Sequence, residues 1–227
     1  MIGYLAQILM MPLPWAVRRT LLARLWGYRI DPEARIGFSV VRPASLEMGP
    51  KSKIGHLNFI RGMDSVRLSA RASIGNLNWI YGIPASQTGG SGSDARLELE
   101  EGAQLTHRHL VDCTNLVRLG RFSVVAGYRT QILTHSVNIR EGVQQAHEIS
   151  FGEFSFVGTG CIVLGGSRLP DHSVLGAGSV LRNDFEEPYR IYSGTPAVSI
   201  SAIPEDAAFF SRSEPYVGFG RSADPAG

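Results

Sequence analysis

Two short polar stretches of the chain contain the residues best suited to chemistry. In one, His135 follows Thr134 and precedes a polar segment, residues 136–148, that ends in His147 and Glu148. A neutral imidazole accepts a proton near neutral pH and can return it later, so His135 is a candidate general base. The alternative interpretation is a structural histidine that is hydrogen-bonded at a corner of the fold.

The other polar stretch, residues 106–115, contains His107, His109, Asp112 and Asn115. Imidazole, carboxylate and amide groups at this density are typical of a site that binds a polar substrate or orients a catalytic residue. We therefore expect His107, His109 and Asp112 to bind an acceptor substrate or to steady an imidazole. Solvated polar side chains at the edge of a strand are the alternative.

A six-residue repeat shows how these stretches are positioned. It is clearest in the hexads that open at Val157, Val163, Leu169 and Leu175, each with an aliphatic first residue and mostly a small fifth residue. Such a period is the signature of a hexapeptide β-helix, in which each hexad forms one strand and one corner. The fold class is therefore an all-β solenoid.

The repeat extends back to Ile30 with two slips of two residues, which makes about six or seven coils. The predicted inward-facing residues are Ile30, Ile36, Met48, Ile54, Ile60, Leu68, Ile74, Ile80, Leu99, Leu105, Val111, Leu119, Val125, Gln131, Phe151, Val157, Val163, Leu169, Leu175 and Leu181. Neighbouring coils stack at about 4.8 Å. In this register Asn115 lies one coil below His135, so we expect Asn115 to orient that imidazole.

The repeat also divides the chain. An apolar and basic arm, residues 1–29, precedes a β-helix domain, residues 30–200, and an irregular tail, residues 201–227, follows it. Two segments interrupt the repeat: the Gly/Ser-rich residues 83–96 and the polar residues 136–148. We expect both to be loops on a rigid scaffold, which is where binding sites are commonly found.

The arm permits two interpretations. Residues 14–26 predict an amphipathic helix with Val17, Leu21, Leu22 and Leu25 on one side. The helix could cap the open end of the solenoid, as terminal units generally do. Alternatively, the Trp and Arg residues of positions 1–26 rest on the inner face of a membrane.

Composition narrows the class of protein. The formal net charge is +2, which predicts no nucleic-acid partner. The two cysteines, Cys113 and Cys161, are far apart and suggest no disulfide framework, so we expect reduced thiols in a cytoplasmic protein.

Several segments resemble the hexapeptide-repeat acyltransferases. The sequence GAGSV at 176–180, followed by YSGTPA at 192–197, is similar to the C-terminal half of that family. Residues 125–136, VAGYRTQILTHS, resemble the stretch that carries the catalytic His in the maltose and galactoside acetyltransferase branch. The Thr-His-Arg-His patch at 106–109 is closer to acetyltransferases that modify polysaccharides.

This resemblance implies a left-handed parallel β-helix, a homotrimer, and acetyl-CoA bound between neighbouring subunits as the acyl donor, with no metal. It implies that His135 is the general base and that Glu148 helps to position it. It also implies a set of residues along the coenzyme: Phe156, Gly158, Thr159, Gly176, Ala177 and Arg182.

The sequence therefore predicts an O-acetyltransferase that modifies a sugar hydroxyl in surface polysaccharide or lipid-linked glycan assembly. Two alternatives remain open at this point. One is a metal-dependent hydratase like the γ-class carbonic anhydrases, which hold a metal with three His from adjacent subunits. The other is a non-catalytic β-helix that serves assembly.

Overall fold

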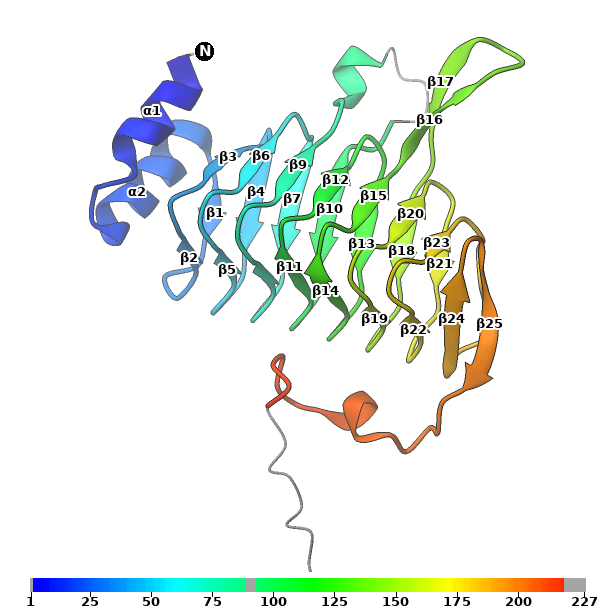
Figure 1. The fold of residues 1–227 in the computed structure, drawn as a ribbon. Helices are drawn as coiled ribbons and strands as arrows, with labels where there is room; N and C mark the ends of the chain where they lie inside the picture. Colours follow the sequence, from blue (N-terminus) through cyan, green and yellow to red (C-terminus); the bar gives the residue numbers. More distant parts are fainter. Residues whose placement is uncertain (1, 89–92, 219–227) are drawn as a thin grey trace, which may run out of the picture.

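The computed structural model describes residues 2–88 and 93–218. Its strands wind around one axis as a left-handed parallel β-helix, which confirms the predicted fold class (Figure 1). Three parallel sheets, here called A, B and C, form the sides of the solenoid, and seven coils contribute one strand to each.

The strand bounds follow the repeat. Sheet A contains β1 (Arg29–Ile30), β4 (Ser45–Met48), β7 (Ser65–Leu68), β10 (Arg96–Leu99), β13 (Val117–Leu119), β18 (Ile149–Phe151) and β21 (Arg168–Leu169). Sheet B contains β2 (Arg35–Ile36), β5 (Lys53–Ile54), β8 (Ser73–Ile74), β11 (Gln104–His107), β14 (Val124–Tyr128), β19 (Phe156–Val157), β22 (Val174–Leu175), β24 (Arg190–Gly194) and β25 (Ala197–Ala202). Sheet C contains β3 (Val40–Arg42), β6 (Phe59–Arg61), β9 (Trp79–Tyr81), β12 (Leu110–Asp112), β15 (Gln131–Leu133), β20 (Ile162–Leu164) and β23 (Val180–Leu181).

The interior of the solenoid is filled by one aliphatic or aromatic side chain per strand. Ile80, Val111 and Val163 of sheet C, for example, are all inaccessible to solvent. Burial of such a side chain stabilises the fold by about 1.5–3 kcal/mol. The apolar first positions of the repeat are therefore the residues that fill the core. The strands stay in register because equivalent positions of successive coils stack on each other.

One inward position was wrongly predicted. Gln131 is exposed, and Ile132 is the fully buried residue that stacks between Val111 and Val163. Seven residues, not six, separate Ile132 from the preceding inward residue Val125, because the corner between them contains one extra residue. This shift changes the neighbours of His135.

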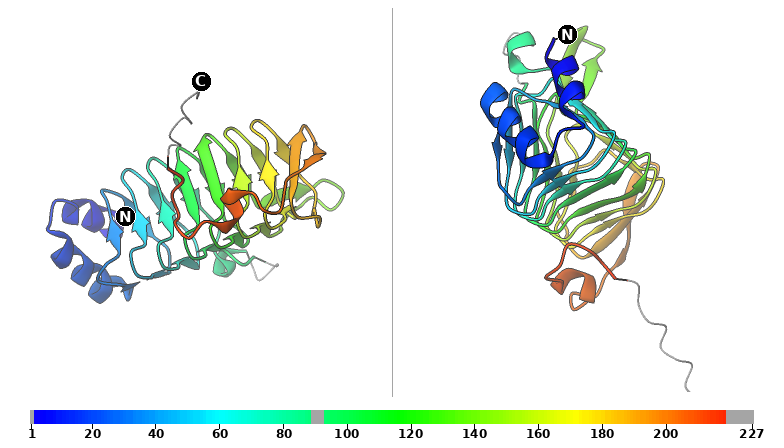
Figure 2. Two further views of the ribbon diagram at one scale, coloured as in Figure 1. Left: turned by 90° about the horizontal axis from the view of Figure 1, so that it is seen from below. Right: turned by 90° about the vertical axis from the view of Figure 1, so that its left-hand side faces the viewer.

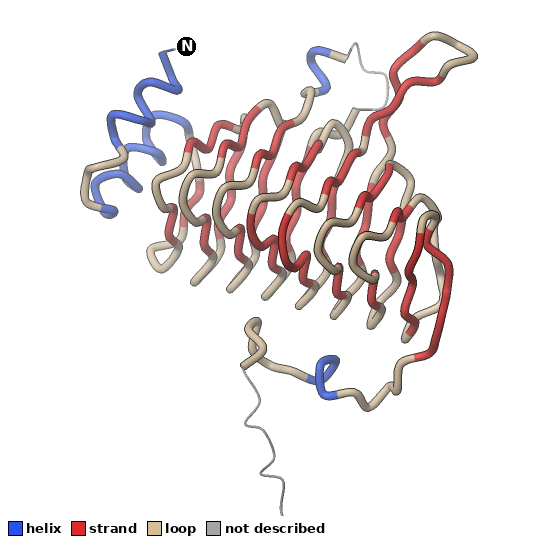
Figure 3. Tube along the Cα trace, viewed as in Figure 1, coloured by secondary structure: helices blue, strands red, loops and turns tan. Residues whose placement is uncertain are grey.

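The two interruptions of the repeat project from the same corner, between sheets C and A (Figure 3). Residues 136–148 are not an irregular loop. They contain most of an antiparallel hairpin, formed by β16 (His135–Asn138) and β17 (Val143–Ala146). The other interruption contains a short 3-10 helix, η1 (Ala85–Gln87), and its residues 89–92 lie outside the described residues.

The arm forms two helices, α1 (Ile2–Met10) and α2 (Trp15–Trp26), at the N-terminal end of the solenoid. Leu22 is buried there, as an apolar helix face predicts, but Val17 and Leu25 are exposed, so the expected single apolar side is divided. None of the helices in the described residues is both long and apolar enough to span a membrane.

The C-terminal segment folds back along the corner between sheets A and B (Figure 2). It contains a second 3-10 helix, η2 (Ala208–Ser211), and residues 219–227 of the predicted tail lie outside the described residues. Phe122, Phe154, His172 and Tyr189 stack in successive coils at ring separations of 5.2, 5.4 and 4.8 Å, and Phe210 packs against this ladder.

Candidate active site

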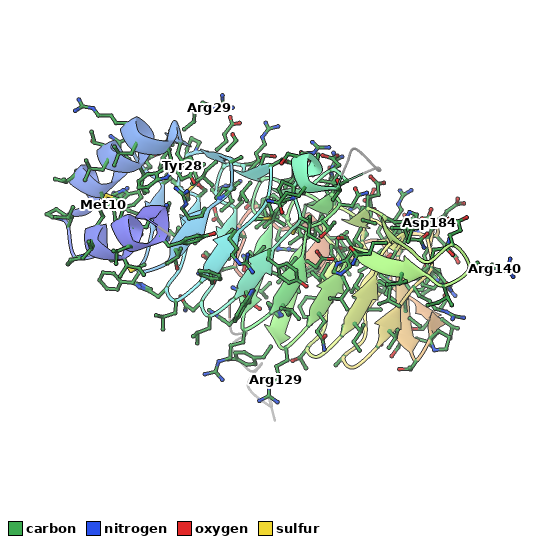
Figure 4. The ribbon with its side chains drawn as sticks, turned by 90° about the horizontal axis from the view of Figure 1, so that it is seen from above. Met10, Tyr28, Arg29, Arg129, Arg140 and Asp184 are labelled. Atoms are coloured by element: carbon green, nitrogen blue, oxygen red, sulfur yellow. The ribbon has the colours of Figure 1, made fainter. Side chains whose placement is uncertain are left out.

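His135 lies at the corner where the chain leaves sheet C. It follows β15 and is the first residue of β16, where its backbone pairs with Ala146 of β17. The hairpin begins here because Thr134 is the last residue whose side chain is held in the solenoid. Figure 4 shows the hairpin, with Arg140 near its tip, extending toward the C-terminal coils.

The imidazole of His135 is held by a buried carboxylate. Its Nδ1 lies 2.6 Å from Oδ2 of Asp112, and its backbone N–H donates to the same oxygen over 2.9 Å. The hydroxyl of Thr134 lies 3.0 Å from Oδ2, and Thr114 donates its backbone N–H and its hydroxyl to Oδ1 over 3.0 and 2.6 Å. Asp112 is fully buried, and its carboxylate accepts from donors on three residues.

This environment determines the protonation state of the pair. Burial by itself would raise the pKa of Asp112, but the hydrogen bonds from Thr114 and His135 outweigh it and hold the pKa below its usual value. An ionised carboxylate only accepts hydrogen bonds, so the Nδ1 of His135 carries the proton. The Nε2 is the ring nitrogen that faces away from the carboxylate, and about 30% of the side chain is exposed to solvent.

The two residues predicted to orient His135 lie elsewhere. The side-chain N–H of Asn115 donates to the backbone oxygen of Ala146 over 2.9 Å, so Asn115 fastens the return strand of the hairpin. Glu148 is exposed and lines a separate groove on the outer face of sheet A. The carboxylate on the imidazole is that of Asp112, for which we had expected either contact with the acceptor or support of an imidazole.

His107 and His109 lie at a different corner, between sheets B and C. His109 is buried, with its Nε2 3.0 Å from the Thr106 hydroxyl and its Nδ1 accepting from the Thr130 backbone over 3.2 Å. Burial, followed by the nearby His107, lowers the pKa of His109 to about 4, so it is neutral at physiological pH. His107 accepts from the backbone of Asn76. The acceptor-binding roles of both residues remain predictions, and within one chain neither lies at the corner of His135.

Four of the predicted coenzyme residues converge. Gly158, Thr159, Gly176 and Ala177 lie in two successive coils at the B–C corner. A Cβ atom at Gly158 would lie 2.7 Å from the backbone N of Ala177, so the two coils are too close there for any side chain at position 158. The corner therefore presents a narrow backbone surface.

The other two coenzyme candidates lie apart from that corner. Phe156 faces outward from sheet B and packs edge-on against Phe209 of the C-terminal segment, with ring centroids 5.9 Å apart. Arg182 is exposed at the end of β23 in sheet C, two coils beyond the strand that precedes His135. Their coenzyme roles remain predictions.

A cavity of about 550 Å³ adjoins His135, between the hairpin and the segment around η1. Its walls combine a few apolar side chains, such as Ile83 and Val143, with neutral hydrogen-bonding groups. The neutral polar residues are Gln87, Thr88, Ser93, Thr114, Gln144 and Gln145. Among the described residues that line the cavity, His135 is the one titratable side chain.

The sequence reasoning missed Thr114 and the glutamines of the hairpin. Thr114 had a local signal, since an Asp followed two residues later by Thr is a common side-chain-to-backbone turn. Gln144 and Gln145 had no such signal, because the pairing of β16 with β17 decides which side of the hairpin each presents.

No group of three or more His, Cys, Asp or Glu side chains lies together as a ligand set within residues 2–88 and 93–218. Both ring nitrogens of His109 are already engaged, and His107 and His135 lie at different corners.

Fold and repeat together define a hexapeptide-repeat β-helix protein. No protein-family profile and no curated protein sequence matches the chain. Among solved structures it is similar to the polysialic acid O-acetyltransferase OatWY, with a TM-score of 0.55, 13% identity, and coverage of 88% of this chain and 90% of that one. It is also similar to a variant of AntD, an N-acyltransferase from Bacillus cereus, in complex with dTDP-4-amino-4,6-dideoxyglucose and coenzyme A. That match has a TM-score of 0.50 and 12% identity over 82% of this chain and 89% of AntD. At these identities the similarity shows the shared fold.

Proposed function

We propose that this protein is an acyltransferase that moves an acetyl group from acetyl-CoA to a sugar hydroxyl, with His135 as the general base. The observation that carries the proposal is the 2.6 Å contact between His135 and the buried Asp112, beside a cavity large enough for a sugar. The solved structures of similar fold include an O-acetyltransferase and an N-acyltransferase in complex with dTDP-4-amino-4,6-dideoxyglucose and coenzyme A, which supports the same class of reaction.

The reaction requires one base and no enzyme-bound acyl group. The Nε2 of His135 accepts the proton of the acceptor hydroxyl as that oxygen attacks the thioester carbon. The tetrahedral intermediate then collapses, the carbon–sulfur bond breaks, and the imidazolium returns the proton to the leaving thiolate. Asp112 stabilises the imidazolium that exists between these two steps, since its carboxylate lies on Nδ1.

The chemistry of the cavity favours a neutral glycan over a charged one. Its amide and hydroxyl groups match the hydroxyls of a sugar, and the described lining offers no carboxylate to hold an amine as an ammonium ion. Hydroxyl acetylation in surface polysaccharide or lipid-linked glycan assembly fits these features better than amine acetylation.

The donor would occupy the narrow B–C corner of one subunit, facing His135 of its neighbour in a homotrimer. The backbone of Gly158, Thr159, Gly176 and Ala177 suits a thin pantetheine arm, and Arg182 suits a phosphate. A γ-class hydratase is less well supported, because His109 has no free ring nitrogen for a metal. A purely structural role leaves the buried carboxylate–imidazole pair unexplained.

Replacement of His135 tests this proposal. The His135→Ala variant should lower acetyl transfer by on the order of 10²–10⁴, because the hydroxyl loses its base. The release of free coenzyme A thiol is measured with acetyl-CoA and a panel of neutral and acidic oligosaccharides, with His56→Ala as the control. Unchanged turnover in His135→Ala would remove this residue from the mechanism, and a preference for acidic acceptors would contradict the neutral site.

A further inference from the structure

The first helix buries one polar side chain, that of Gln7, and leaves three large apolar side chains exposed. Gln7 of α1 is buried against the first coil, where its side chain donates to the backbone oxygen of Val41 over 2.7 Å and accepts from the Val41 N–H over 2.8 Å. Val41 lies in β3, the edge strand of sheet C, whose backbone would otherwise lack a partner on that side. Gln7 therefore fastens α1 to the solenoid together with Met10, which is buried in the core, and Tyr4, whose ring lies 6.0 Å from that of Phe59.

The second helix, α2, also bonds to the backbone of the first coil through a polar side chain, here beside sheet B. The buried guanidinium of Arg18 in α2 donates to the backbone oxygens of Ile36, Gly37 and Ser39 over 3.1, 2.8 and 3.3 Å. These carbonyls belong to the first coil near the edge strand β2. Polar side chains thus satisfy the open end of the β-helix, and capping does not require the outer apolar side chains of the arm.

Six of the arm's large apolar side chains are exposed and are here together called the arm face: Leu5, Ile8, Leu9, Leu13, Val17 and Leu25. Within α1, Leu5, Ile8 and Leu9 have the i, i+3, i+4 spacing of one helix side, and they are 59, 50 and 68% exposed. They project away from the side that carries Gln7. Figure 2, in its right-hand view, shows both helices lying across the N-terminal end of the coils.

The charges within residues 1–30 are of one sign, but Arg18 is buried against the first coil and Arg29 pairs with Glu47 over 2.9 Å, which leaves Arg19 and Arg24. Residues 1–30 contain no Asp or Glu, and they contain four arginines, of which Arg24 is exposed on α2. An exposed apolar helix side flanked by cations is complementary to an anionic lipid surface. Two copies of this face packed together would instead bring like charges into proximity.

We propose that the arm face binds the surface of a lipid bilayer that contains anionic phospholipid. The apolar side of α1 enters the boundary between headgroups and acyl chains, and Arg24 contacts lipid phosphates. The nine residues of α1 span about 14 Å. Because this is about half the thickness of the hydrocarbon core of a bilayer, the helix lies in the plane of the surface. The β-helix then projects from the membrane by its N-terminal end. This property does not depend on the acyltransferase activity.

Vesicle flotation of the full-length protein tests this proposal directly. The probes are phosphatidylcholine vesicles with and without phosphatidylglycerol, and no acetyl-CoA is added. We expect the wild type to float with the anionic vesicles and the double variant Leu5→Ser/Leu9→Ser to bind more weakly by on the order of tenfold. Arg24→Glu should weaken binding to the anionic vesicles selectively.

The matched control is Val198→Ser/Ile200→Ser. These residues lie on β25 at the opposite end of the solenoid and are 54 and 59% exposed, so the control removes a similar apolar area. It should float like the wild type. The proposal is overturned if the wild type binds neither kind of vesicle, or if the Leu5/Leu9 variant binds like the wild type. It is also overturned if that variant instead abolishes a self-association of the protein measured without lipid.

Discussion

Asp112 is the residue on which the geometry of the candidate site depends. Its carboxylate accepts hydrogen bonds from Thr114, Thr134 and His135, and these hold the corner closed around a fully buried charge. A buried carboxylate is tolerated only when it is so paired. The same bonds fix the imidazole tautomer, so the structural and chemical demands on Asp112 coincide.

Asp112→Asn should separate these two demands. The amide places N–H groups against existing donors, so we expect a loss of about 1–3 kcal/mol in the free energy of unfolding. Acetyl transfer should fall on the order of 100-fold, because the ring loses its orientation and the imidazolium loses its stabilising charge. The decisive readout is the pH dependence of the rate of acetyl transfer. If Asp112 had only a structural role, the decline of this rate on the acid side (the acid limb) would occur at the same pH in the variant as in the wild type. Asn115→Ala, which only loosens the hairpin, should not shift that limb.

His109 makes stability depend on pH. Its pKa is about 4 in the folded chain against 6.5 for an unperturbed His, so the unfolded state binds the proton first. The stability it contributes is complete above pH 6.5 and declines toward pH 4, by on the order of 3 kcal/mol. Denaturant unfolding across this window should show the decline. In His109→Asn, which matches Asn58 and Asn78 at the same corner of earlier coils, that decline should disappear, and an unchanged slope would contradict the assignment.

At the scale of elements, the β16–β17 hairpin closes the cavity beside His135. Its first residue is the candidate base, and its return strand contributes Gln144 and Gln145 to the wall. Asn115 ties that strand to the solenoid through Ala146. The candidate base and two of the groups proposed to bind the acceptor are thus carried by one small element, whereas the corner proposed for the donor belongs to the coils.

Shortening the hairpin should weaken the binding of the acceptor and leave the binding of acetyl-CoA unchanged. Residues 137–144 can be replaced by Asn-Gly, because Ser136 pairs with Gln145 and a two-residue turn can join them. We expect KM for the acceptor to rise about tenfold through the loss of contacts, while calorimetry shows unchanged acetyl-CoA affinity. An equal loss of acetyl-CoA affinity would assign the hairpin to the donor site instead.

At the scale of the whole molecule, the three outer faces of the solenoid differ in polarity. Sheet A presents charged residues such as Arg67, Glu98 and Arg118, whereas sheet C presents a row of apolar side chains. That row consists of Phe59, Trp79, Leu110, Ile162 and Val180, with the exposed Gln131 between Leu110 and Ile162. An apolar strip of this length on one face favours sheet C as the face buried in the proposed homotrimer.

Trp79→Glu tests the oligomeric state. Trp79 is 53% exposed in the single chain, and a carboxylate there would be buried without a partner in a trimer. We expect light scattering to show a monomer, and acetyl-CoA affinity to fall because the proposed donor cleft lies between subunits. Trp79→Phe should remain trimeric. A wild-type protein that is monomeric while fully active would contradict both the trimer and the shared cleft.

The solenoid also sets the distance between its two proposed functional regions. β15 lies four coils beyond β3, so at about 4.8 Å per coil His135 stands roughly 19 Å along the axis from the first coil. A glycan that extends from a lipid anchor would reach that height, whereas the anchor itself would remain at the arm.

The amino-acid sequence by itself determined the architecture of the coils. Inward side chains recur about every six residues because each strand buries one of them. The core residues can therefore be identified from the local sequence, and nearly every residue predicted to face inward does so. The exception, Gln131, follows a corner with one extra residue, and its apolar neighbour Ile132 takes the inward position.

Only the tertiary structure decided how the site is assembled. Asp112 lies 23 residues before His135, and whether it or Asn115 reaches the imidazole depends on the one-residue shift at Ile132. The β16–β17 hairpin and the burial of Gln7 were likewise invisible, since the first depends on pairing within residues 135–146 and the second on the unpaired backbone of Val41 in the first coil. Hydrophobic burial follows a repeat that sequence displays, whereas hydrogen bonding between distant residues follows directions that only the folded backbone defines.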